Sequence, residues 1–416
     1  MHWLRSLGFL LLCCSGATAG DWPQWLGPNR DASSPERVVP WKEAPKFLWS
    51  VEVGEGNSSP VVANGRVFVH AKVKDKDAEV LFAIDAKKGK ILWYAEYERE
   101  AFKSLYGNGP RATPAVDGDH VYTFGITGVL SCWEAATGKK VWQYPALSGK
   151  NLFFGMACSP LVDGDRVLVN IGGKGNSVVA YNKNTGLGIW WGQDDRASYS
   201  SPILVGKGQE RQVIFLTGDG LISLNATDGS LFWRYPLVDK LLESSTTPVL
   251  AGDILLASSI TYGSVGLRLE SKDGKPTASE IWKNPELTSY FTTPVPVGPE
   301  HIYFVKGTKP PALFNRATLH CVEAKTGKDL WRKPQTVGKY HASLLRTGDN
   351  KLLMLEEAGN LVLVDPSPQE YRELARSAVC GETWAHPALA DGKLYVRDNK
   401  RLICLQLADA GPGNGR

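Results

Sequence analysis

The chain has 416 residues, with 47 lysine and arginine residues against 43 aspartate and glutamate residues, a formal net charge of +4. This charge is too small and too scattered to favour nucleic acid as a partner. A hydrophobic content of 43% with 22% charged residues is ordinary for a soluble globular chain. No apolar run reaches the length of a membrane-spanning helix, so no transmembrane segment is expected.

The first residues predict a secretory signal peptide. Arg5 gives a basic start, a short apolar stretch follows, and an Ala-Thr-Ala cleavage site ends at Ala19. We therefore expect residues 1–19 to be removed and the protein to be secreted across the inner membrane, into the periplasm or the extracellular space. The alternative is a lipoprotein signal at Cys13 or Cys14, but the leucine before Cys13 is bulkier than such signals usually carry.

Residues 20–46 are rich in proline, glycine and asparagine and have no hydrophobic period. Disordered segments rarely contain tryptophan, and this one contains Trp22 and Trp25. We expect an ordered lead-in whose two tryptophans pack on the outside of the domain that follows.

From residue 47 to residue 408 the chain repeats one unit. Each copy contains an alternating apolar run, a glycine turn and a short strand that ends on tryptophan, as in LHCVEAKTGKDLW from Leu319 to Trp331. Glycine suits the turn because it tolerates positive φ. A large ring at one place per unit is a packing device that docks between neighbouring sheets. These tryptophans are Trp49, Trp93, Trp142, Trp190, Trp233, Trp282 and Trp331.

A second marker, Ser/Thr-Pro before an apolar run, gives the number of units. Its prolines are Pro60, Pro114, Pro160, Pro202, Pro248, Pro294 and Pro387, with a degenerate copy at Ser343. Repeats of about 47 residues that hold four strands are typical of β-propellers. The sequence therefore predicts an all-β fold, one propeller domain of eight four-stranded blades.

The two ends of the repeat predict how the ring closes. The strand from Phe47 to Val53 ends a unit that has no beginning, and the strand from Leu402 to Leu407 has no fourth strand after it. We expect the N-terminal strand to complete the last blade, which removes exposed sheet edges. Residues 409–416 are expected to be a flexible tail. Blade five carries an irregular segment, and blade seven has Leu374 in place of the tryptophan.

Motifs for catalysis or metal binding are scarce. The cysteines at 132, 158, 321, 380 and 404 are odd in number and follow no metal-binding spacing. Cys132, Cys321 and Cys404 fall at like positions of the repeat, and we expect them to be buried apolar fillers rather than disulfides. The serines near the markers belong to the repeat. Asp194 and Asp195 form a pair that would suit Ca²⁺, but a solvated loop is the simpler interpretation. The sequence therefore predicts no catalytic residue and no metal site.

The best candidate site is the mouth of the central channel. The residues three positions before each marker are Asn57, Arg111, Ala157, Tyr199, Ser245, Phe291, Tyr340 and Trp384. A constraint of the fold would make them alike, whereas these differ, and aromatic residues and arginine are what recognition surfaces favour. We predict a ligand or partner site at Asn57, Arg111, Tyr199, Phe291, Tyr340, His341, Trp384 and His386. Nearby lie Glu382 and the insertion Tyr106 to Arg111. The alternative is that the rings only pack the loops over the channel.

The copies AIDAKKGKILW, CWEAATGKKVW and CVEAKTGKDLW resemble the tryptophan-docking repeat of eight-bladed quinoprotein dehydrogenases and their non-enzymatic relatives. In length and economy the chain resembles the PQQ-like repeat proteins of BamB type from the bacterial envelope. That resemblance implies a monomeric scaffold without a cofactor. It would bind an envelope protein or peptide in outer-membrane protein assembly or envelope biogenesis.

Two alternatives stay open. The first is an oxidoreductase with PQQ and Ca²⁺ in the channel and Glu382 or Glu243 as base. Quinoprotein dehydrogenases place a disulfide of adjacent cysteines against the quinone, and the adjacent pair here, Cys13-Cys14, belongs to the predicted signal. Their insertions with the Ca²⁺ ligands have no counterpart that we can match. The second alternative is a carbohydrate-binding propeller that stacks sugars on Tyr199, Phe291, Tyr340 and Trp384.

Overall fold

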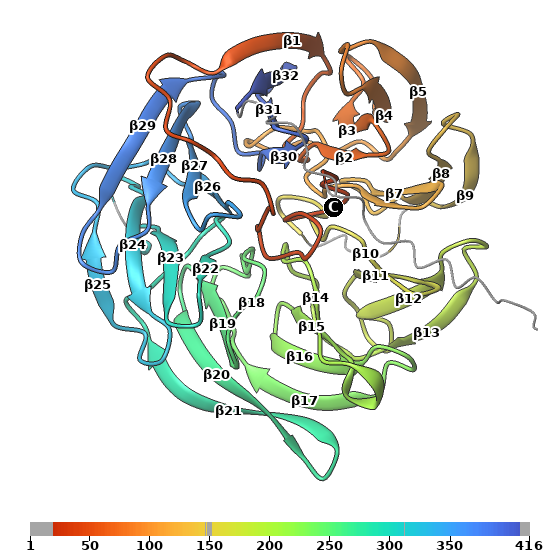
Figure 1. The fold of residues 1–416 in the computed structure, drawn as a ribbon. Helices are drawn as coiled ribbons and strands as arrows, with labels where there is room; N and C mark the ends of the chain where they lie inside the picture. Colours follow the sequence, from red (N-terminus) through yellow and green to blue (C-terminus); the bar gives the residue numbers. More distant parts are fainter. Residues whose placement is uncertain (1–19, 146, 148–151, 312, 408–416) are drawn as a thin grey trace, which may run out of the picture.

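The strands assemble into sheets of four, and in all but one sheet these four are consecutive in the chain. The computed structural model describes residues 20–145, 147, 152–311 and 313–407, and over these residues eight such sheets surround a central channel (Figure 1). The prediction of an all-β, eight-bladed propeller is confirmed. The predicted signal peptide and the tail at 409–416 lie outside the described residues. Within the described part, no helix is both long and apolar enough to span a membrane.

In each blade the first strand lies nearest the channel and the fourth lies at the periphery (Figure 1). The first four blades contain β2 (Val61–Ala63), β3 (Arg66–Lys72), β4 (Ala78–Asp85) and β5 (Ile91–Glu98); β6 (Ala115–Asp117), β7 (His120–Phe124), β8 (Leu130–Glu134) and β9 (Lys140–Tyr144); β10 (Leu161–Asp163), β11 (Arg166–Asn170), β12 (Val178–Asn182) and β13 (Gly188–Gly192); β14 (Ile203–Val205), η1 (Gly208–Glu210), β15 (Gln212–Leu216), β16 (Gly220–Asn225) and β17 (Leu231–Pro236).

The other four blades follow the same order. They contain β18 (Val249–Ala251), β19 (Ile254–Ser259), β20 (Gly263–Lys272) and β21 (Lys275–Asn284); β22 (Val295–Val297), β23 (His301–Lys306), β24 (Thr318–Glu323) and β25 (Asp329–Arg332); β26 (Ala342–Arg346), β27 (Leu352–Glu356), β28 (Asn360–Asp365) and β29 (Arg372–Ala378); β30 (Ala388–Ala390), β31 (Lys393–Arg397), β32 (Arg401–Gln406) and β1 (Lys46–Glu52). The irregular segment of blade five is the long hairpin β20–β21, which projects from the disc (Figure 1).

Strand β1 closes the ring. It pairs antiparallel with β32, and Trp49 lies opposite Cys404. The last blade thus combines the two ends of the domain, as predicted, and pairs the edge that β32 would otherwise expose.

The repeated tryptophans join neighbouring blades. Nε1 of Trp282 donates a hydrogen bond to the Ala324 carbonyl of the next blade at 2.8 Å. The ring lies over Gly327, whose φ is +66° and where a Cβ would come within 2.5 Å of the ring. Trp49, Trp93 and Trp142 make the same kind of bond at 3.3, 3.1 and 3.0 Å. The glycine therefore serves both its own turn and the tryptophan of the preceding blade.

Where the repeat is irregular, the docking changes. In blade five the glycine turn, at Gly274, lies at the tip of the long β20–β21 hairpin, and no ring of the described residues lies over it. Trp233 donates instead to Gln212 Oε1 of its own blade at 3.0 Å. Blade seven lacks the glycine, and Trp331 donates to the Ser367 carbonyl at 2.7 Å. Nε1 of Trp190 has no partner among the described residues. The ring position is kept in each case, while the hydrogen bond depends on the next blade.

The Ser/Thr-Pro markers form a belt of hydrogen bonds around the channel. The backbone N–H before a marker proline donates to the side-chain hydroxyl at the same position of the next blade. The belt bonds run from Ser59 to Thr113 at 3.2 Å, Thr113 to Ser159 at 2.9 Å, Ser159 to Ser201 at 2.9 Å, Thr247 to Thr293 at 3.1 Å and His386 to Ser59 at 2.9 Å. Serine or threonine is needed here because its hydroxyl accepts while the backbone continues into the strand.

The expectation that Trp22 and Trp25 pack on the outside of the domain is wrong. Trp22 exchanges two backbone hydrogen bonds of 2.8 Å with Val62 on the innermost strand of blade one, and its side chain is buried. The lead-in then crosses the centre of the disc before it runs out to β1 (Figure 1). The short inner strands leave this centre open, and the lead-in fills it.

Replacing Trp282 by alanine is expected to lower the free energy of unfolding by about 3–5 kcal/mol, because a buried ring and a hydrogen bond between blades are lost. Urea unfolding followed by circular dichroism measures this. Trp191 is the matched control, since 64% of its surface is exposed, and W191A should change stability little. Equal losses in the two variants would contradict the docking role.

Candidate functional site

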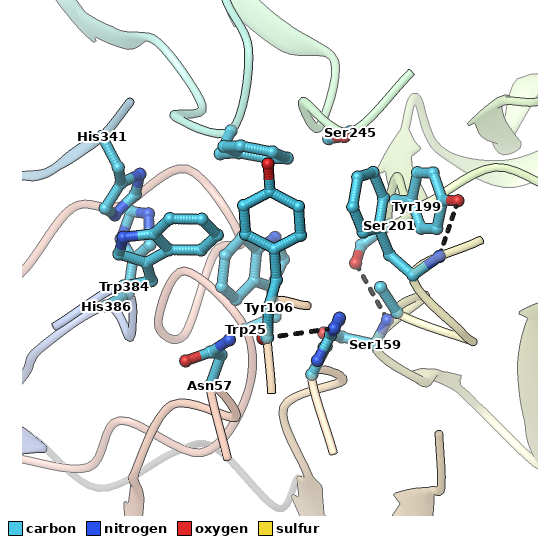
Figure 2. A pocket seen from close by; sticks show the side chains of 14 residues that line it. Trp25, Asn57, Tyr106, Ser159, Tyr199, Ser201, Ser245, His341, Trp384 and His386 are labelled. Carbon is cyan, nitrogen blue, oxygen red and sulfur yellow. Dashed lines mark hydrogen bonds between the residues drawn. The ribbon is translucent and has the colours of Figure 1, made fainter. Parts of the chain in front are cut away.

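All eight residues of the predicted site lie together at the channel mouth. Seven of them line one cavity of about 110 Å³ (Figure 2), namely Asn57, Arg111, Tyr199, Phe291, His341, Trp384 and His386. The eighth, Tyr340, contacts this group through its ring, 5.8 Å from Trp384 and 6.3 Å from Phe291. Six of them share the same spacing before a marker, and this brings them together because the markers lie at the same level in every blade. His341 and His386 lie closer to their markers, in the same two blades as Tyr340 and Trp384.

The aromatic rings of the mouth pack on one another. Phe291 stacks on Tyr290 with centroids 3.8 Å apart and on Trp384 at 5.2 Å. Tyr106 lies 5.3 Å from Phe154 and 5.7 Å from Trp384. The rings are therefore at once the packing of the loops and the wall of the cavity, so the two interpretations do not exclude each other. The sequence pattern did not identify Tyr290 or Phe154. Tyr290 directly precedes Phe291, and Phe154 lies in a loop between blades that does not follow the repeat.

The lead-in forms the floor of the cavity. Trp25 donates from Nε1 to Thr247 Oγ1 at 2.9 Å and contacts His386 edge to face at 4.8 Å. Arg30 is buried and donates to the Pro202, Pro160 and Ser159 carbonyls at 2.9, 3.0 and 3.2 Å. Burial lowers its pKa to about 10. The sequence indicated the role of the lead-in as a floor only weakly, through two tryptophans in a segment without a hydrophobic period.

Arg111 shapes its own loop and faces the cavity. It donates to the carbonyls of Gly109 at 3.2 Å, Gly107 at 3.3 Å and Tyr106 at 3.4 Å. Burial lowers the pKa of its guanidinium to about 10, although the charges of Tyr199, Glu55 and Glu79 act in the opposite direction. Within the described part of the chain, Arg111 forms no ion pair. It stays a cation at neutral pH with donors to spare.

Two histidines lie behind Trp384 (Figure 2). His341 is satisfied, since its Nδ1 lies 3.0 Å from Thr292 Oγ1 and its Nε2 lies 3.0 Å from Ser343 Oγ. His386 is buried, but its Nε2 has no partner among the described residues. Burial lowers the pKa of His341 to about 4 and the pKa of His386 to about 3. Both imidazoles are therefore neutral at physiological pH.

The carboxylates of the mouth lie outside this cavity. Glu357 accepts from Trp384 Nε1 at 2.7 Å and so holds the indole in place. Glu243 accepts from the Tyr290 hydroxyl, and burial raises its pKa. Glu382 is exposed and lines a second, neighbouring cavity of about 350 Å³, together with Glu55. Glu243 and Glu382, the two bases considered from the sequence, are absent from the lining of the first cavity.

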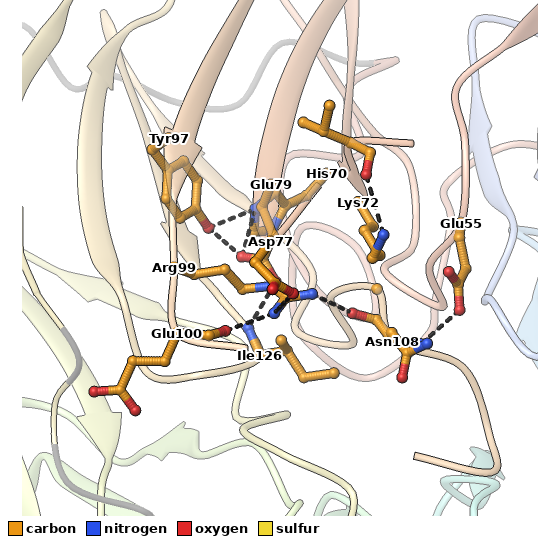
Figure 3. A network of polar contacts seen from close by, with 12 residues as sticks. Glu55, His70, Lys72, Asp77, Glu79, Tyr97, Arg99, Glu100, Asn108 and Ile126 are labelled. Carbon is orange, nitrogen blue, oxygen red and sulfur yellow. Dashed lines mark hydrogen bonds and ion pairs between the residues drawn. The ribbon is translucent and has the colours of Figure 1, made fainter. Parts of the chain in front are cut away.

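A buried polar network anchors the loop that carries Tyr106 (Figure 3). Glu79 accepts from the Tyr97 hydroxyl and from the Ile126 N–H at 3.0 Å, and lies 3.6 Å from Arg99. Arg99 in turn donates to the Asn108 carbonyl at 3.1 Å. Burial raises the pKa of Glu79. The network ties the loop to the edge of blade one.

The expectation that the Asp194-Asp195 pair lies in a solvated loop is wrong for Asp195. This residue is buried, lies 2.6 Å from Arg234 and accepts from Thr217 at 3.0 Å. Asp194 accepts from the Gly175 N–H at 2.7 Å. Over the described ranges, no three histidine, cysteine, aspartate or glutamate side chains gather in a way that would hold a metal ion. The five cysteines are free, and all except Cys380 are buried.

Comparison with known proteins gives a family match. A family model described as "Outer membrane protein assembly factor BamB" matches residues 32–109 and 77–333. The protein of that name from Burkholderia pseudomallei is 30% identical over 250 residues, which is 57% of this chain and 59% of the relative. The one from Shewanella oneidensis is 22% identical over 379 residues, 85% of this chain and 86% of the relative. The chain thus spans less than two thirds of the Burkholderia relative.

Solved structures share the fold. BamB from Moraxella catarrhalis has a TM-score of 0.62 at 15% identity, covering 87% of this chain and 100% of that chain. The quinohemoprotein alcohol dehydrogenase from Comamonas testosteroni has a TM-score of 0.67 at 14% identity, covering 97% and 83%. At these identities the likeness is one of fold alone, which a scaffold and an enzyme share.

Acid is expected to destabilise the protein through its buried histidines. The pKa values of His70, His341 and His386 fall to about 3, 4 and 3 in the folded chain from the usual 6.5. Because the unfolded chain binds protons that the folded chain refuses, this contribution is complete above pH 6.5. It declines by about 1.4 kcal/mol per pH unit and histidine as the pH falls toward 4.

Urea unfolding of the wild type and the H386Q variant at pH 7, 6 and 5 measures this slope. The variant should lose less stability between pH 6 and 5 than the wild type. Parallel slopes for the wild type and the variant would contradict the buried, neutral state of His386.

Proposed function

The chain belongs to the family of the outer membrane protein assembly factor BamB, and from this premise we propose that it is a non-enzymatic scaffold of the cell envelope. It holds a protein or peptide partner on the face of the propeller where the channel opens. The names of the relatives support a role in outer-membrane protein assembly or a related step of envelope biogenesis. The predicted signal peptide supports a place outside the cytoplasm.

One observation carries this proposal: large apolar side chains are exposed on the face that bears the aromatic mouth. Leu105 is 90% exposed, Phe153 62%, Leu313 95% and Phe314 75%. Because the strands of a blade are antiparallel, the loops between blades and the loop between second and third strands lie on the same face. A gathering of apolar side chains on one face marks an interaction surface more often than chance exposure.

These side chains are continuous with the mouth. Leu105 precedes Tyr106 in the chain, and Phe153 packs on Phe154 with centroids 5.0 Å apart. The loop that carries Leu313 and Phe314 is tied to the mouth, because Asn315 Nδ2 donates to the Tyr340 hydroxyl at 3.0 Å. The exposed residues and the ring cluster therefore form one surface, with anchors of the kind that dominate binding energy in interfaces.

The residues of the mouth speak against PQQ with Ca²⁺. The cavity lined by the rings of Tyr106, Phe154, Phe291 and Trp384 has about 110 Å³, less than the roughly 300 Å³ or more of pockets for ligands of that size, and Arg111 is the one charged residue in its lining. The adjoining cavity of about 350 Å³ is lined by two acidic residues, Glu55 and Glu382, which match a ligand with three carboxylates poorly. In the part of the chain that the structure describes, no three histidine, cysteine, aspartate or glutamate side chains gather in a way that would hold a metal ion such as Ca²⁺. We therefore derive no redox step, and we propose a function without a cofactor.

The carbohydrate interpretation is also less well supported. Sugar stacking needs a free aromatic face, whereas Phe291 has Tyr290 at 3.8 Å and Trp384 at 5.2 Å, both stacked on it. Tyr199 is 8% exposed and accepts from the Phe154 N–H at 3.1 Å.

A photo-crosslinking amino acid placed at Leu105, Phe153 or Phe314 is expected to capture one and the same envelope protein in living cells. Leu187 serves as the control, because it is 68% exposed but lies in the turn between third and fourth strands, on the opposite face. The double variant L105E/F314E should weaken binding of the captured protein by at least about tenfold, since two apolar anchors become charged. Capture of the same protein from Leu187, or of no protein from the mouth, would refute the proposed surface.

Titration of the purified protein with PQQ, with and without Ca²⁺, is expected to give no saturable change in absorbance or tryptophan fluorescence. The reasons are the small size of the ring-lined cavity and the lack, over the described ranges, of a cluster of histidine, cysteine or acidic side chains that would hold the metal. Tight binding that depends on Ca²⁺ would overturn the proposal of a scaffold without a cofactor. A screen for alcohol and sugar oxidation would then follow.

A further inference from the structure

The cavity at the channel mouth is lined by hydrogen-bond donors and lacks carboxylates. Its polar lining consists of Asn57, Arg111, Ser159, Tyr199, Ser201, Ser245, His341 and His386, and its other lining residues are aromatic except for Ala157. The neighbouring cavity shares Asn57, Tyr106, Arg111 and Trp384 with it and differs in having Glu55 and Glu382 in its lining. A cavity of about 110 Å³ among rings with a single positive charge in its lining is unusual, since a largely buried charge is costly without a counter-charge.

Three hydroxyl groups of the lining have a proton left to donate. Ser159 Oγ accepts from the Thr113 N–H at 2.9 Å, Ser201 Oγ accepts from the Ser159 N–H at 2.9 Å, and the Tyr199 hydroxyl accepts from the Phe154 N–H at 3.1 Å (Figure 2). None of the three donates a recorded hydrogen bond within the described ranges. Since each oxygen is already an acceptor, its own O–H remains available to donate to an acceptor in the cavity.

Arg111 adds charge to these donors. Its three recorded hydrogen bonds to loop carbonyls use both terminal nitrogens. A guanidinium carries five N–H groups, so Nε and one terminal N–H have no recorded acceptor. The nearest acids form no ion pair with Arg111 within the described ranges. Glu55 lines the second cavity together with Arg111 and accepts from the Asn108 N–H, and Glu79 is engaged with Tyr97 and Arg99.

His386 is an independent sign that a ligand belongs here. It lines the same cavity, it is 3% exposed, and its Nε2 has no partner in the described part of the chain. Unsatisfied buried nitrogens are rare in folded proteins and call for an explanation. As a neutral imidazole, it can present an N–H at this atom to an acceptor in the cavity.

We propose that this cavity binds a carboxylate attached to an apolar body. The carboxylate accepts from the free N–H groups of Arg111 and from the hydroxyls of Ser159, Ser201 and Tyr199, and the apolar body lies among the rings of Phe154, Phe291 and Trp384. Arginine suits this role because its planar fork matches a carboxylate. The same chemistry is offered by a free small acid and by the C-terminal end of a protein chain. The inference does not depend on the proposed scaffold role.

Calorimetric titration at constant ionic strength tests the proposal with matched probes. Benzoate is expected to bind saturably, and benzamide, which has the same shape without the charge, at least about tenfold more weakly. Filling the cavity by A157L should abolish benzoate binding without removing a donor. R111Q should weaken it by about tenfold or more, whereas R372Q, whose side chain is 63% exposed, should leave it unchanged.

The two sources are distinguished by the peptide acetyl-Gly-Gly-Leu and its C-terminal amide. Tighter binding of the free peptide than of benzoate, lost in the amide, would identify a chain end as the ligand. Tighter binding of benzoate would identify a free acid. Both results support the carboxylate site. It is overturned if neither acid binds at about 10 mM, if benzamide binds as well as benzoate, or if A157L folds and still binds benzoate.

Because R111Q also removes bonds within its own loop, its circular dichroism and melting temperature are compared with those of A157L. A folded A157L variant that keeps the wild-type melting temperature carries the test even if R111Q unfolds. None of these experiments uses a partner protein. A failed carboxylate site would therefore leave the photo-crosslinking result standing, and the reverse also holds.

Discussion

The hydrogen-bond belt between the inner strands is the constraint on which the rest of this propeller depends. A backbone N–H in one blade donates to a serine or threonine hydroxyl in the next, as from Thr113 to Ser159 and from Ser159 to Ser201. This sets the level and spacing of the blades around the channel. It also contributes to the chemistry of the mouth, because two belt hydroxyls, those of Ser159 and Ser201, line the cavity and each accepts from the neighbouring blade, so each keeps its own proton to donate. The repeat thus supplies two of the donors in the cavity.

The lead-in converts a channel into a cavity with a floor. Trp25 and Arg30 come from a segment outside the repeat, and they contact blades three, four and five by hydrogen bonds to Ser159, Pro202 and Thr247. Carbonyl oxygens surround the Arg30 guanidinium, which is the way in which a buried cation is tolerated without a counter-charge. With the floor closed, the mouth is the open side of the cavity, and a partner or ligand reaches Arg111 and the rings from that face.

Positions that depart from the repeat distinguish candidate functional residues from those that only maintain the fold. The tryptophan and the glycine that seats it recur because every blade must dock on the next. The loops over the channel take no part in this docking, and their sequences differ from blade to blade. Tyr106, Phe154 and Tyr340 come from three different loops, yet their rings meet. The loop that carries Tyr106 needs a separate anchor, the buried network around Glu79 and Arg99. The fold itself does not require this anchor, so its presence under one loop fits a surface that binds a partner or a ligand.

The sequence by itself determined the architecture, because the same packing requirement recurs in every blade and therefore produces a periodic pattern of residues. The markers at Pro60 to Pro387, the docking tryptophans and the closing strand β1 all followed from that period. The same spacing located six of the eight predicted site residues, and the two histidines were found beside it in the sequence. Only the tertiary structure decided what has no period. In the folded chain the lead-in lies in the channel, Asp195 pairs with Arg234, and Phe154 and Tyr290 pack in the ring cluster. These contacts depend on distances across the ring between residues of different blades, and no local pattern encodes them.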